Sequence, residues 1–124
     1  MKETGLNRKQ LGALGEERAA QYLEGLGYRI RERNWRCRTG EIDIIAESGP
    51  LLIFVEVRTR SGNRAFGTPQ ESVDYRKQQQ VAGTAQVYIH RCQLQELQPR
   101  FDVISVMTDK AGGSISIEHI ENAF

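Results

Sequence analysis

The sequence predicts an α/β domain in which two helices flank a central mixed sheet. One segment near the N-terminus has helical periodicity, several short apolar runs have the length and composition of strands, and a second helical segment separates two groups of these runs. With 124 residues, of which 39% are hydrophobic, the chain is long enough for one compact core and short for two. We therefore expect one domain over residues 1–124, with the order α-β-β-β-α-β-β.

The two helices are marked by apolar spacing and by their ends. Over residues 8–26, leucine, alanine and tyrosine recur at three- and four-residue steps, and Gly27 follows as a helix stop. The second helix is predicted to end near His90, but its start is ambiguous. Residues 68–71, Thr-Pro-Gln-Glu, have the form of a capping box with proline at the first helical position, whereas Asp74 would cap a later start.

Five segments are predicted to be strands, at about residues 28–34, 41–47, 51–58, 101–107 and 114–120. The second and third form a hairpin around the Ser-Gly-Pro turn at residues 48–50, and the third is apolar enough to be buried on both faces. Residues 59–67 are polar and contain glycine, which predicts a mobile loop. Residues 109–113 are expected to form the turn between the last two strands.

Composition excludes several classes of protein. The longest apolar run, residues 51–57, is far below the roughly 18 residues that a membrane span needs, and residues 1–5 lack the apolar segment of a signal peptide. Cys37 and Cys92 have neither metal-ligand spacing nor the density of a disulfide scaffold, so we expect two reduced thiols. These features predict a cytoplasmic protein with no membrane partner.

Arginines are concentrated at residues 29–38, where RIRERNWRCR contains five of them, although the formal net charge of the chain is only +1. A second basic stretch, Arg58, Arg60 and Arg64, follows the hairpin. A local basic surface is typical of phosphate binding, but arginines at every second position also protect an edge strand from aggregation, and the spacing does not decide between the two. The candidate nucleic-acid-binding residues are Arg31, Arg33, Arg36, Arg38, Arg60 and Lys77.

The hairpin carries acids that a hydrophobic core would not select. Residues two apart on a strand share a face, so Glu41 and Asp43 project together, as do Glu56 and Arg58 on the partner strand. Neighbouring carboxylates repel unless a cation lies between them, and hard oxygen ligands suit Mg²⁺ or Mn²⁺. With Arg58 as a nearby positive charge, the pattern is typical of phosphodiester cleavage, although ion pairs at the strand ends would give the same short pattern.

A resemblance to a known family spans residues 12–124. The segments that carry it are LGEERAAQYLEGLGYRI, ERNWRCRTGEIDIIA, LIFVEVRTR, FGTPQESV, RFDVISV and IEHIENAF. Through them the chain resembles the YraN-like family of small bacterial proteins. That family looks like the archaeal Holliday-junction resolvases and the wider PD-(D/E)xK nuclease superfamily, so the resemblance implies a restriction-endonuclease-like fold.

The resemblance also implies roles for particular residues. Asp43 matches the nuclease motif's aspartate, Glu56 matches its second acid, and Glu16 matches the acid that the resolvases carry in their first helix. Arg58 stands where the motif has lysine. The implied catalytic residues are therefore Glu16, Asp43, Glu56 and Arg58. The implied Mg²⁺ or Mn²⁺ would be held by Asp43, Glu56 and the carbonyl of Val57.

Arg58 separates the functional hypotheses, because arginine stays protonated and cannot act as a general base. The first hypothesis is a metal-dependent endonuclease for branched or distorted DNA, with Glu16, Asp43 and Glu56 converging on one cleft. The second is a nucleic-acid-binding protein that keeps the same fold without cleaving. The third is a protein-interaction module in which the hairpin acids only form ion pairs. A resolvase must make paired cuts, for which a twofold homodimer is the usual arrangement.

Five further polar residues have less specific interpretations. Glu41 has no counterpart in the nuclease motif and would have a supporting role. Gln70 and Lys77, in or near the second helix, either face the same pocket or are solvated. His90 and His119 lie apart from the motif, and we expect both to be structural or exposed rather than catalytic.

Overall fold

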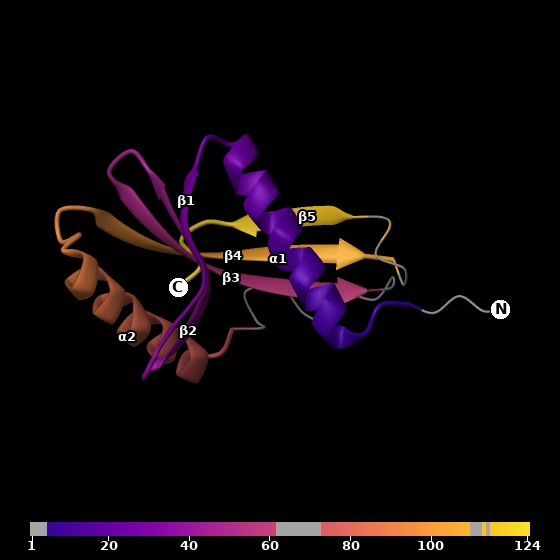
Figure 1. Ribbon diagram of the computed structural model, residues 1–124, viewed down its shortest axis with the longest axis horizontal. Coiled ribbons are helices and arrows are strands. Elements are labelled where there is room, and N and C mark those ends of the chain that lie inside the picture. The colour runs from indigo at the N-terminus through magenta and orange to yellow at the C-terminus, as the bar shows by residue number, and fades with distance from the viewer. Residues whose placement is uncertain (1–4, 62–72, 110–112, 114) are drawn as a thin grey trace.

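The computed structural model describes residues 5–61, 73–109, 113 and 115–124 (Figure 1). Its elements are α1 (Arg8–Gly25), β1 (Arg29–Cys37), β2 (Gly40–Ser48), β3 (Leu51–Ser61), α2 (Tyr75–Cys92), β4 (Gln98–Thr108) and β5 (Ser116–Ile120). They follow one another in the predicted order, which confirms the α/β class. None of the described helices is long and apolar enough to cross a membrane. Cys37 and Cys92 are free thiols, as predicted.

The strands form a mixed sheet in which spatial order follows chain order, β1-β2-β3-β4-β5. Neighbouring strands are antiparallel except for β3 and β4, which run parallel from Leu51↔Gln98 to Ser61↔Thr108. Parallel neighbours cannot be joined by a tight hairpin, and α2 lies in the connection between them. β1 and β5 are the edges of this sheet.

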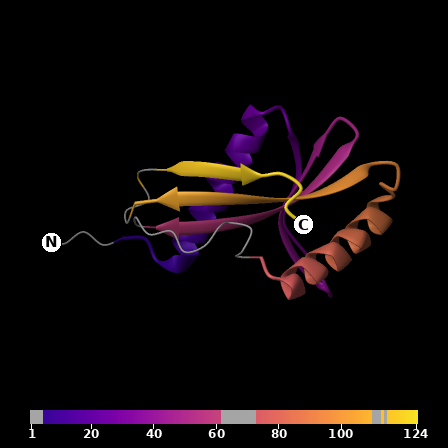
Figure 2. The ribbon, with the colours of Figure 1, turned by 180° about the vertical axis from the view of Figure 1, so that it is seen from behind.

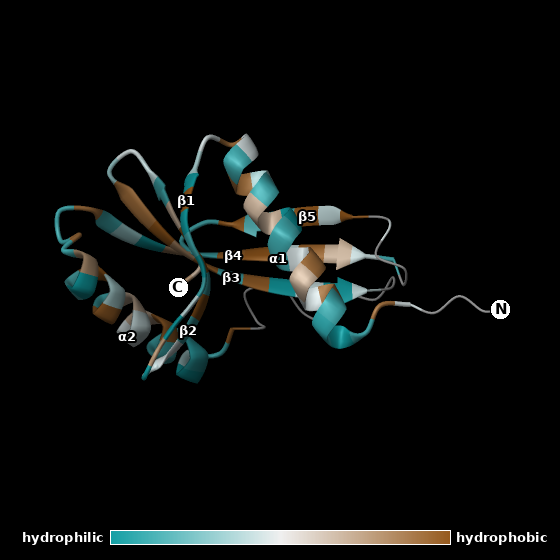
Figure 3. Cartoon of the chain, viewed as in Figure 1, coloured by the Kyte–Doolittle hydropathy of each residue, from teal (hydrophilic) through white to brown (hydrophobic). Residues whose placement is uncertain are grey.

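The two helices cover opposite faces of the sheet (Figures 1 and 2). The α1 face contains Ala19, Ala20, Leu23, Ile53, Val55 and Val57. The α2 face contains Leu52, Phe54, Val81, Ala85, Tyr88 and Ile89. Successive residues of β3 therefore alternate between two cores, which confirms that this strand is buried on both faces. Figure 3 shows the hydrophobic segments along the central strands and hydrophilic residues on both helices.

The sequence around α1 determines both its start and its close packing on β3. The Asn7 side chain accepts the backbone N–H of Gln10 at 2.8 Å, and the Gln10 side chain accepts that of Asn7, which forms a capping box. Gly15 permits the close approach of α1, because a Cβ at this position would overlap the side chain of Thr59 on β3. Gly27, with φ of 93°, follows the end of the helix as predicted.

The start of α2 is set by Asp74, the later of the two predicted caps. Its carboxylate accepts the backbone N–H of Lys77 at 2.9 Å, and the helix begins at Tyr75. The alternative start at residues 68–71 lies outside the described residues. α2 continues past His90 to Cys92 and is followed by Gln93 in the left-handed conformation.

Several strands are longer than predicted. β1 continues to Cys37, and β4 begins at Gln98. β3 continues through Ser61, so the prediction of a mobile loop is wrong for residues 59–61; they are ordered because they pair with β4 as far as Thr108. The rest of that loop, residues 62–67, lies outside the described residues, as does most of the turn predicted at residues 109–113. β5 begins at Ser116.

A buried network around Asp102 joins β4, β5 and α1. The Asp102 carboxylate accepts hydrogen bonds from Arg100 at 2.8 and 2.9 Å and from the backbone N–H of Asn122 at 3.0 Å, and it lies 2.7 Å from Nε2 of His119. Burial by itself would raise the pKa of Asp102, but the hydrogen bonds from these partners outweigh this effect, so the net result is a lowered pKa. Nδ1 of His119 lies 3.2 Å from the Tyr22 hydroxyl, so His119 belongs to this network.

Candidate active site

β2 separates from β3 at Asp43. The two strands pair from Ser48↔Leu51 to Ile44↔Val55. Residues two apart on a regular strand share a face. Ile44 packs on the α1 face, however, whereas Ile42, beyond the last pair, packs on the α2 face. The backbone of β2 therefore turns at Asp43. The Asp43 carboxylate accepts the backbone N–H of Val57 at 2.8 Å and so supplies an acceptor to β3 past the end of the backbone pairing.

Glu56 is a buried carboxylate with an incomplete set of partners. Only 3% of its side chain is exposed, and Oε1 lies 3.6 Å from Nζ of Lys77. Its other oxygen, Oε2, is buried without a hydrogen-bond partner among the described residues. Burial raises the pKa of Glu56 to about 7, and the charge of Asp43 adds to the effect. Because an unpaired buried oxygen costs free energy, Glu56 is prepared to accept a cation or a donor from a ligand.

Asp43 of β2 acts electrostatically on Glu16 of α1 and on Glu56 of β3, so the three acids lie near the point where these elements meet. Burial raises the pKa of Asp43, although the Val57 N–H and the charge of Lys77 oppose this rise. Burial also raises the pKa of Glu16, and the negative charge of Asp43 adds to it. Asp43 is thus the common electrostatic neighbour of the other two acids.

Arg58 and Lys77 place positive charge next to these acids. The charges of both residues lower the pKa of Asp43 and of Glu56, in opposition to burial. Nε of Arg58 is buried and has no hydrogen-bond partner in the part of the chain that the structure describes. Lys77 reaches the site from the first turn of α2 and faces Glu56 rather than only solvent. Gln70 and Arg64 lie outside the described residues.

The donors suited to a metal ion here are two carboxylates and a backbone carbonyl. Among the described residues, no group of three or more His, Cys, Asp or Glu side chains is arranged so that it could hold a metal ion. Mg²⁺ commonly takes only one or two protein carboxylates and keeps several waters. Asp43 and Glu56 with the Val57 carbonyl fit that requirement, because their donors are hard oxygens and Glu56 Oε2 has no hydrogen-bond partner in the described part of the chain.

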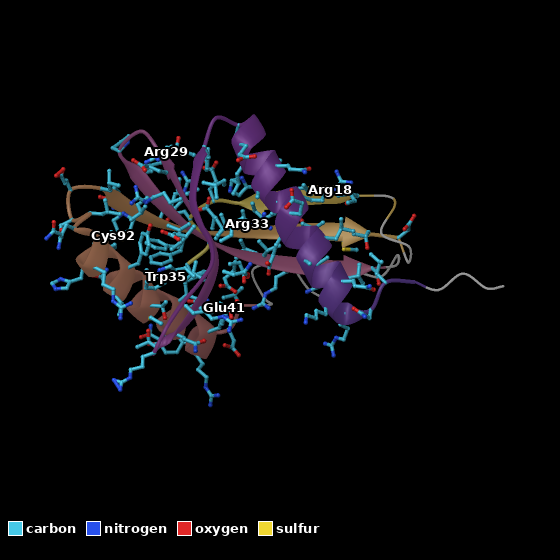
Figure 4. The ribbon with its side chains drawn as sticks, viewed as in Figure 1. Arg18, Arg29, Arg33, Trp35, Glu41 and Cys92 are labelled. Atoms are coloured by element: carbon cyan, nitrogen blue, oxygen red, sulfur yellow. The ribbon has the colours of Figure 1, made fainter. Side chains whose placement is uncertain are left out.

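Two polar grooves lie near the acids, but neither is lined by Asp43 or Glu56, so the three predicted acids do not line one cleft among the described grooves. The α1 groove has a volume of about 510 Å³ and lies between the first half of α1 and the end of β3. Its lining includes Arg8, Gly12, Glu16, Arg58 and Arg60. The α2 groove has a volume of about 410 Å³ and lies between the β1–β2 turn and the start of α2. Its lining includes Arg36, Cys37, Gly40, Glu41, Lys77 and Gln80. Glu41, labelled in Figure 4, lies beside the turn between β1 and β2.

The arginines of β1 do not share one face, contrary to what their every-second-residue spacing predicts. The register of β1 with β2 shifts around Arg31, which interrupts the alternation. Arg31 then contacts Tyr88 of α2 at 3.0 Å, whereas Arg33, labelled in Figure 4, pairs with Glu17 of α1 at 2.8 Å. β1 is nevertheless an edge strand, which is the position that the alternative interpretation of these arginines requires.

The predicted phosphate-binding arginines differ in how available they are. The Arg31 side chain is only 21% exposed and is engaged inside the protein. The Arg36 side chain is 74% exposed and lies 3.5 Å from Glu41, and Arg38 is exposed in the β1–β2 turn. Arg60 lines the α1 groove. The exposed residues are therefore the better candidates for binding a phosphate.

Arg8, which was not predicted as a site residue, lines the α1 groove together with Glu16. The signal available was spacing, because residues 8, 12 and 16 are four apart and lie on one side of a helix. The middle position is Gly12, where a Cβ would meet nothing within 4 Å, so this side of α1 is open.

A family model described as "Uncharacterised protein family UPF0102" matches residues 15–106, a range that contains the three acids. The chain is a member of the UPF0102 family. This finding confirms the predicted YraN-like membership. A UPF0102 protein of Desulforamulus reducens is 49% identical over 120 residues, covering 95% of this chain and 98% of the relative. UPF0102 proteins of Caldanaerobacter subterraneus subsp. tengcongensis and Dictyoglomus turgidum are 45% and 41% identical, each covering 96% of this chain and 98% and 100% of the respective relative.

Proposed function

We propose that this protein is a divalent-metal-dependent endonuclease that acts on branched or distorted DNA. The observation that carries the proposal is Glu56, a carboxylate that is 3% exposed, has one oxygen with no partner among the described residues and lies near a half-buried acid, Asp43. Ion pairing that satisfied Glu56 would engage both of its oxygens, whereas Oε2 has no hydrogen-bond partner among the described residues. This difference disfavours the hypothesis that the hairpin acids are only ion-pair partners.

The side chains of the site have complementary roles under this proposal. Asp43, Glu56 and the Val57 carbonyl would hold Mg²⁺ or Mn²⁺. The ion, when bound, lowers the pKa of a water ligand and neutralises charge on the phosphate. Arg58 and Lys77 each present a positive charge that can orient a phosphate oxygen. Glu16, whose pKa is raised, accepts a proton more readily at its carboxylate than an exposed glutamate does.

We further propose that the fold is restriction-endonuclease-like and related to the archaeal Holliday-junction resolvases. The element order, the mixed sheet with a helix on each face and the acids at the open end of the hairpin support this relation. A resolvase makes paired cuts, so the active form would be a homodimer with twofold symmetry. The proposal also places the protein in the cytoplasm, where its DNA substrate lies and where the two free thiols would stay reduced.

A nucleic-acid-binding protein that does not cleave is the second candidate, and the contact between Lys77 and Glu56 favours it. At 3.6 Å, Lys77 already offsets part of the charge of Glu56 without a metal. Arg58 cannot act as a general base in place of the motif lysine. In this case the grooves would bind phosphates, and the acids would take no part in cleavage.

Cleavage of a four-way DNA junction in Mg²⁺ or Mn²⁺ separates the two candidates. Asp43→Asn retains an oxygen for the Val57 N–H but loses its charge, and we expect cleavage slower by at least about a hundredfold. Arg58→Lys should retain or raise the rate, and Arg58→Ala should lose most of it. Glu24→Gln, at an exposed acid of α1, should cut like wild type.

The same assay identifies failure of the proposal. If wild type and Arg58→Lys cut no faster than Asp43→Asn while all three bind the junction, the nuclease proposal is wrong and the non-cleaving protein is the correct interpretation.

A further inference from the structure

The ammonium of Lys77 lies where a second cation at Glu56 would also have to bind. Among the described residues, one ion pair engages the acids Glu16, Asp43 and Glu56, and it joins Nζ of Lys77 to Oε1 of Glu56 at 3.6 Å. This distance exceeds that of a charge-assisted hydrogen bond, so the contact does not fix the ammonium in one position. Glu56 Oε2 has no hydrogen-bond partner in the described part of the chain. The carboxylate is therefore loosely held by one cation and retains an oxygen for another.

The charges around this contact oppose the entry of a divalent ion. Burial raises the pKa of Asp43 and of Glu56, and the charges of Arg58 and Lys77 both oppose that rise. With all four side chains ionised, two negative charges face two positive ones, so an ion would enter a site without net charge. Moving one of the positive charges away would leave a net attraction for the ion.

The backbone of Lys77 is fixed, but its side chain has room to move. Its backbone N–H donates to the Asp74 side chain at 2.9 Å in the first turn of α2. The side chain is 34% exposed and lines the α2 groove, which has a volume of about 410 Å³. The start of α2 lies beside the β1–β2 turn, where the Gln80 side chain donates to the Thr39 carbonyl at 3.2 Å (Figures 1 and 2). The flexible four-carbon stem can therefore turn the ammonium from Glu56 into this groove while the fold stays unchanged.

We propose that Lys77 neutralises Glu56 in the metal-free protein and is displaced when a divalent ion binds, so that its ammonium turns into the α2 groove and binds a phosphate of the DNA backbone. This inference rests on the proposed function, because it describes how the same site acquires its metal. Before the ion binds, the contact with Lys77 prevents Glu56 from being a buried charge without a counter-charge. The same contact lowers the affinity for the ion, which has to displace the ammonium.

Mn²⁺ binding by the DNA-free protein at about pH 8, followed by electron paramagnetic resonance of the free ion, tests the displacement. Lys77→Met removes the charge, and Lys77→Gln removes it but keeps a donor for Glu56. Both should bind Mn²⁺ about tenfold more tightly than wild type, because a positive charge a few ångströms from a divalent ion weakens its binding by about that factor. Lys77→Arg keeps the charge and should bind no more tightly than wild type. Arg76→Met, at the exposed preceding position, should change Kd less than about twofold.

Fluorescence anisotropy with a labelled four-way junction tests the contact with phosphate. The junction would be compared in EDTA and in saturating Ca²⁺, which takes the same oxygen ligands as Mg²⁺ in a looser geometry. In EDTA, Lys77 is engaged by Glu56, so Lys77→Met should change the affinity less than about twofold. In Ca²⁺ the same variant should bind roughly five- to tenfold more weakly than wild type at about 0.1 M salt, the value of one phosphate contact. Arg76→Met should have the same effect in both buffers.

Mn²⁺ binding by Lys77→Met and Lys77→Gln that is equal to or weaker than that of wild type would overturn the displacement. An equal loss of junction affinity in EDTA and in Ca²⁺ would overturn the contact with phosphate. Either result together with metal-dependent junction cleavage would leave the proposed nuclease intact. Conversely, tighter Mn²⁺ binding by both neutral variants, without cleavage by wild type, would support the displacement and reject the nuclease.

Discussion

Replacing Glu56 with glutamine should remove most of the pH dependence that this buried carboxylate gives to folding stability. In the folded protein the pKa of Glu56 is raised from 4.5 to about 7, chiefly by burial and then by the charge of Asp43. Between these two values the native state keeps a proton that the unfolded state has lost, so the free energy of unfolding falls as pH rises. At about 1.4 kcal/mol per pH unit, the penalty reaches about 3 kcal/mol and is complete above about pH 7.

Urea unfolding at about pH 5 and about pH 8, in EDTA, measures this effect. Between these values, the free energy of unfolding of wild type should fall by about 2 to 3 kcal/mol more than that of Glu56→Gln. Comparing the change with pH cancels the constant cost of burying a glutamine amide. Glu24→Gln, at an exposed position of α1, should follow wild type. Equal pH dependence in wild type and Glu56→Gln would refute the reasoning that Glu56 is desolvated in the folded protein.

Two further predictions concern the packing of α1 on β3 and the hydrogen-bond network around Asp102. Gly15→Ala should destabilise the protein by about 1 to 3 kcal/mol, because its Cβ would overlap Thr59, whereas Gly12→Ala should be neutral or stabilise by up to about 1 kcal/mol. Equal thermal midpoints for the two variants would contradict the close approach of α1 to β3. Asp102→Ala should lower the free energy of unfolding in urea by about 3 kcal/mol, because it leaves the buried partners of Asp102 unpaired. Glu121 also pairs with Arg100 but is 59% exposed, so Glu121→Ala should lower it by less than about 1 kcal/mol. Similar losses would show that Asp102 does not anchor the network.

The parts of the fold that were predicted correctly depend on interactions within a few residues. Apolar spacing and the glycine stop at Gly27 located α1, and the turn at residues 48–50 located the hairpin. Strand parity drew attention to Asp43 and Glu56, and the structure places the Asp43 carboxylate on the backbone of Val57, the residue after Glu56. Asp74 was recognisable as a cap for the same local reason.

The parts that were not predicted depend on segments far apart in the sequence. β3 continues to Ser61 because it pairs with β4, which no pattern within residues 59–61 reveals. The register shift around Arg31 directs this side chain to Tyr88, so spacing alone cannot tell an exposed arginine from an engaged one. The approach of Lys77 to Glu56 likewise depends on how α2 lies on the sheet.

Titration of the DNA-free protein with Mn²⁺, followed by electron paramagnetic resonance of the free ion, tests most directly whether Asp43 and Glu56 form a site for a divalent cation. We predict a site that Glu56→Gln abolishes and Glu24→Gln leaves unchanged. Because Mn²⁺ must displace the proton of a carboxylate whose pKa is about 7, its Kd should decrease about tenfold between about pH 6 and about pH 8. Mn²⁺ binding that is equal in wild type and Glu56→Gln, or that does not change with pH, would contradict such a site.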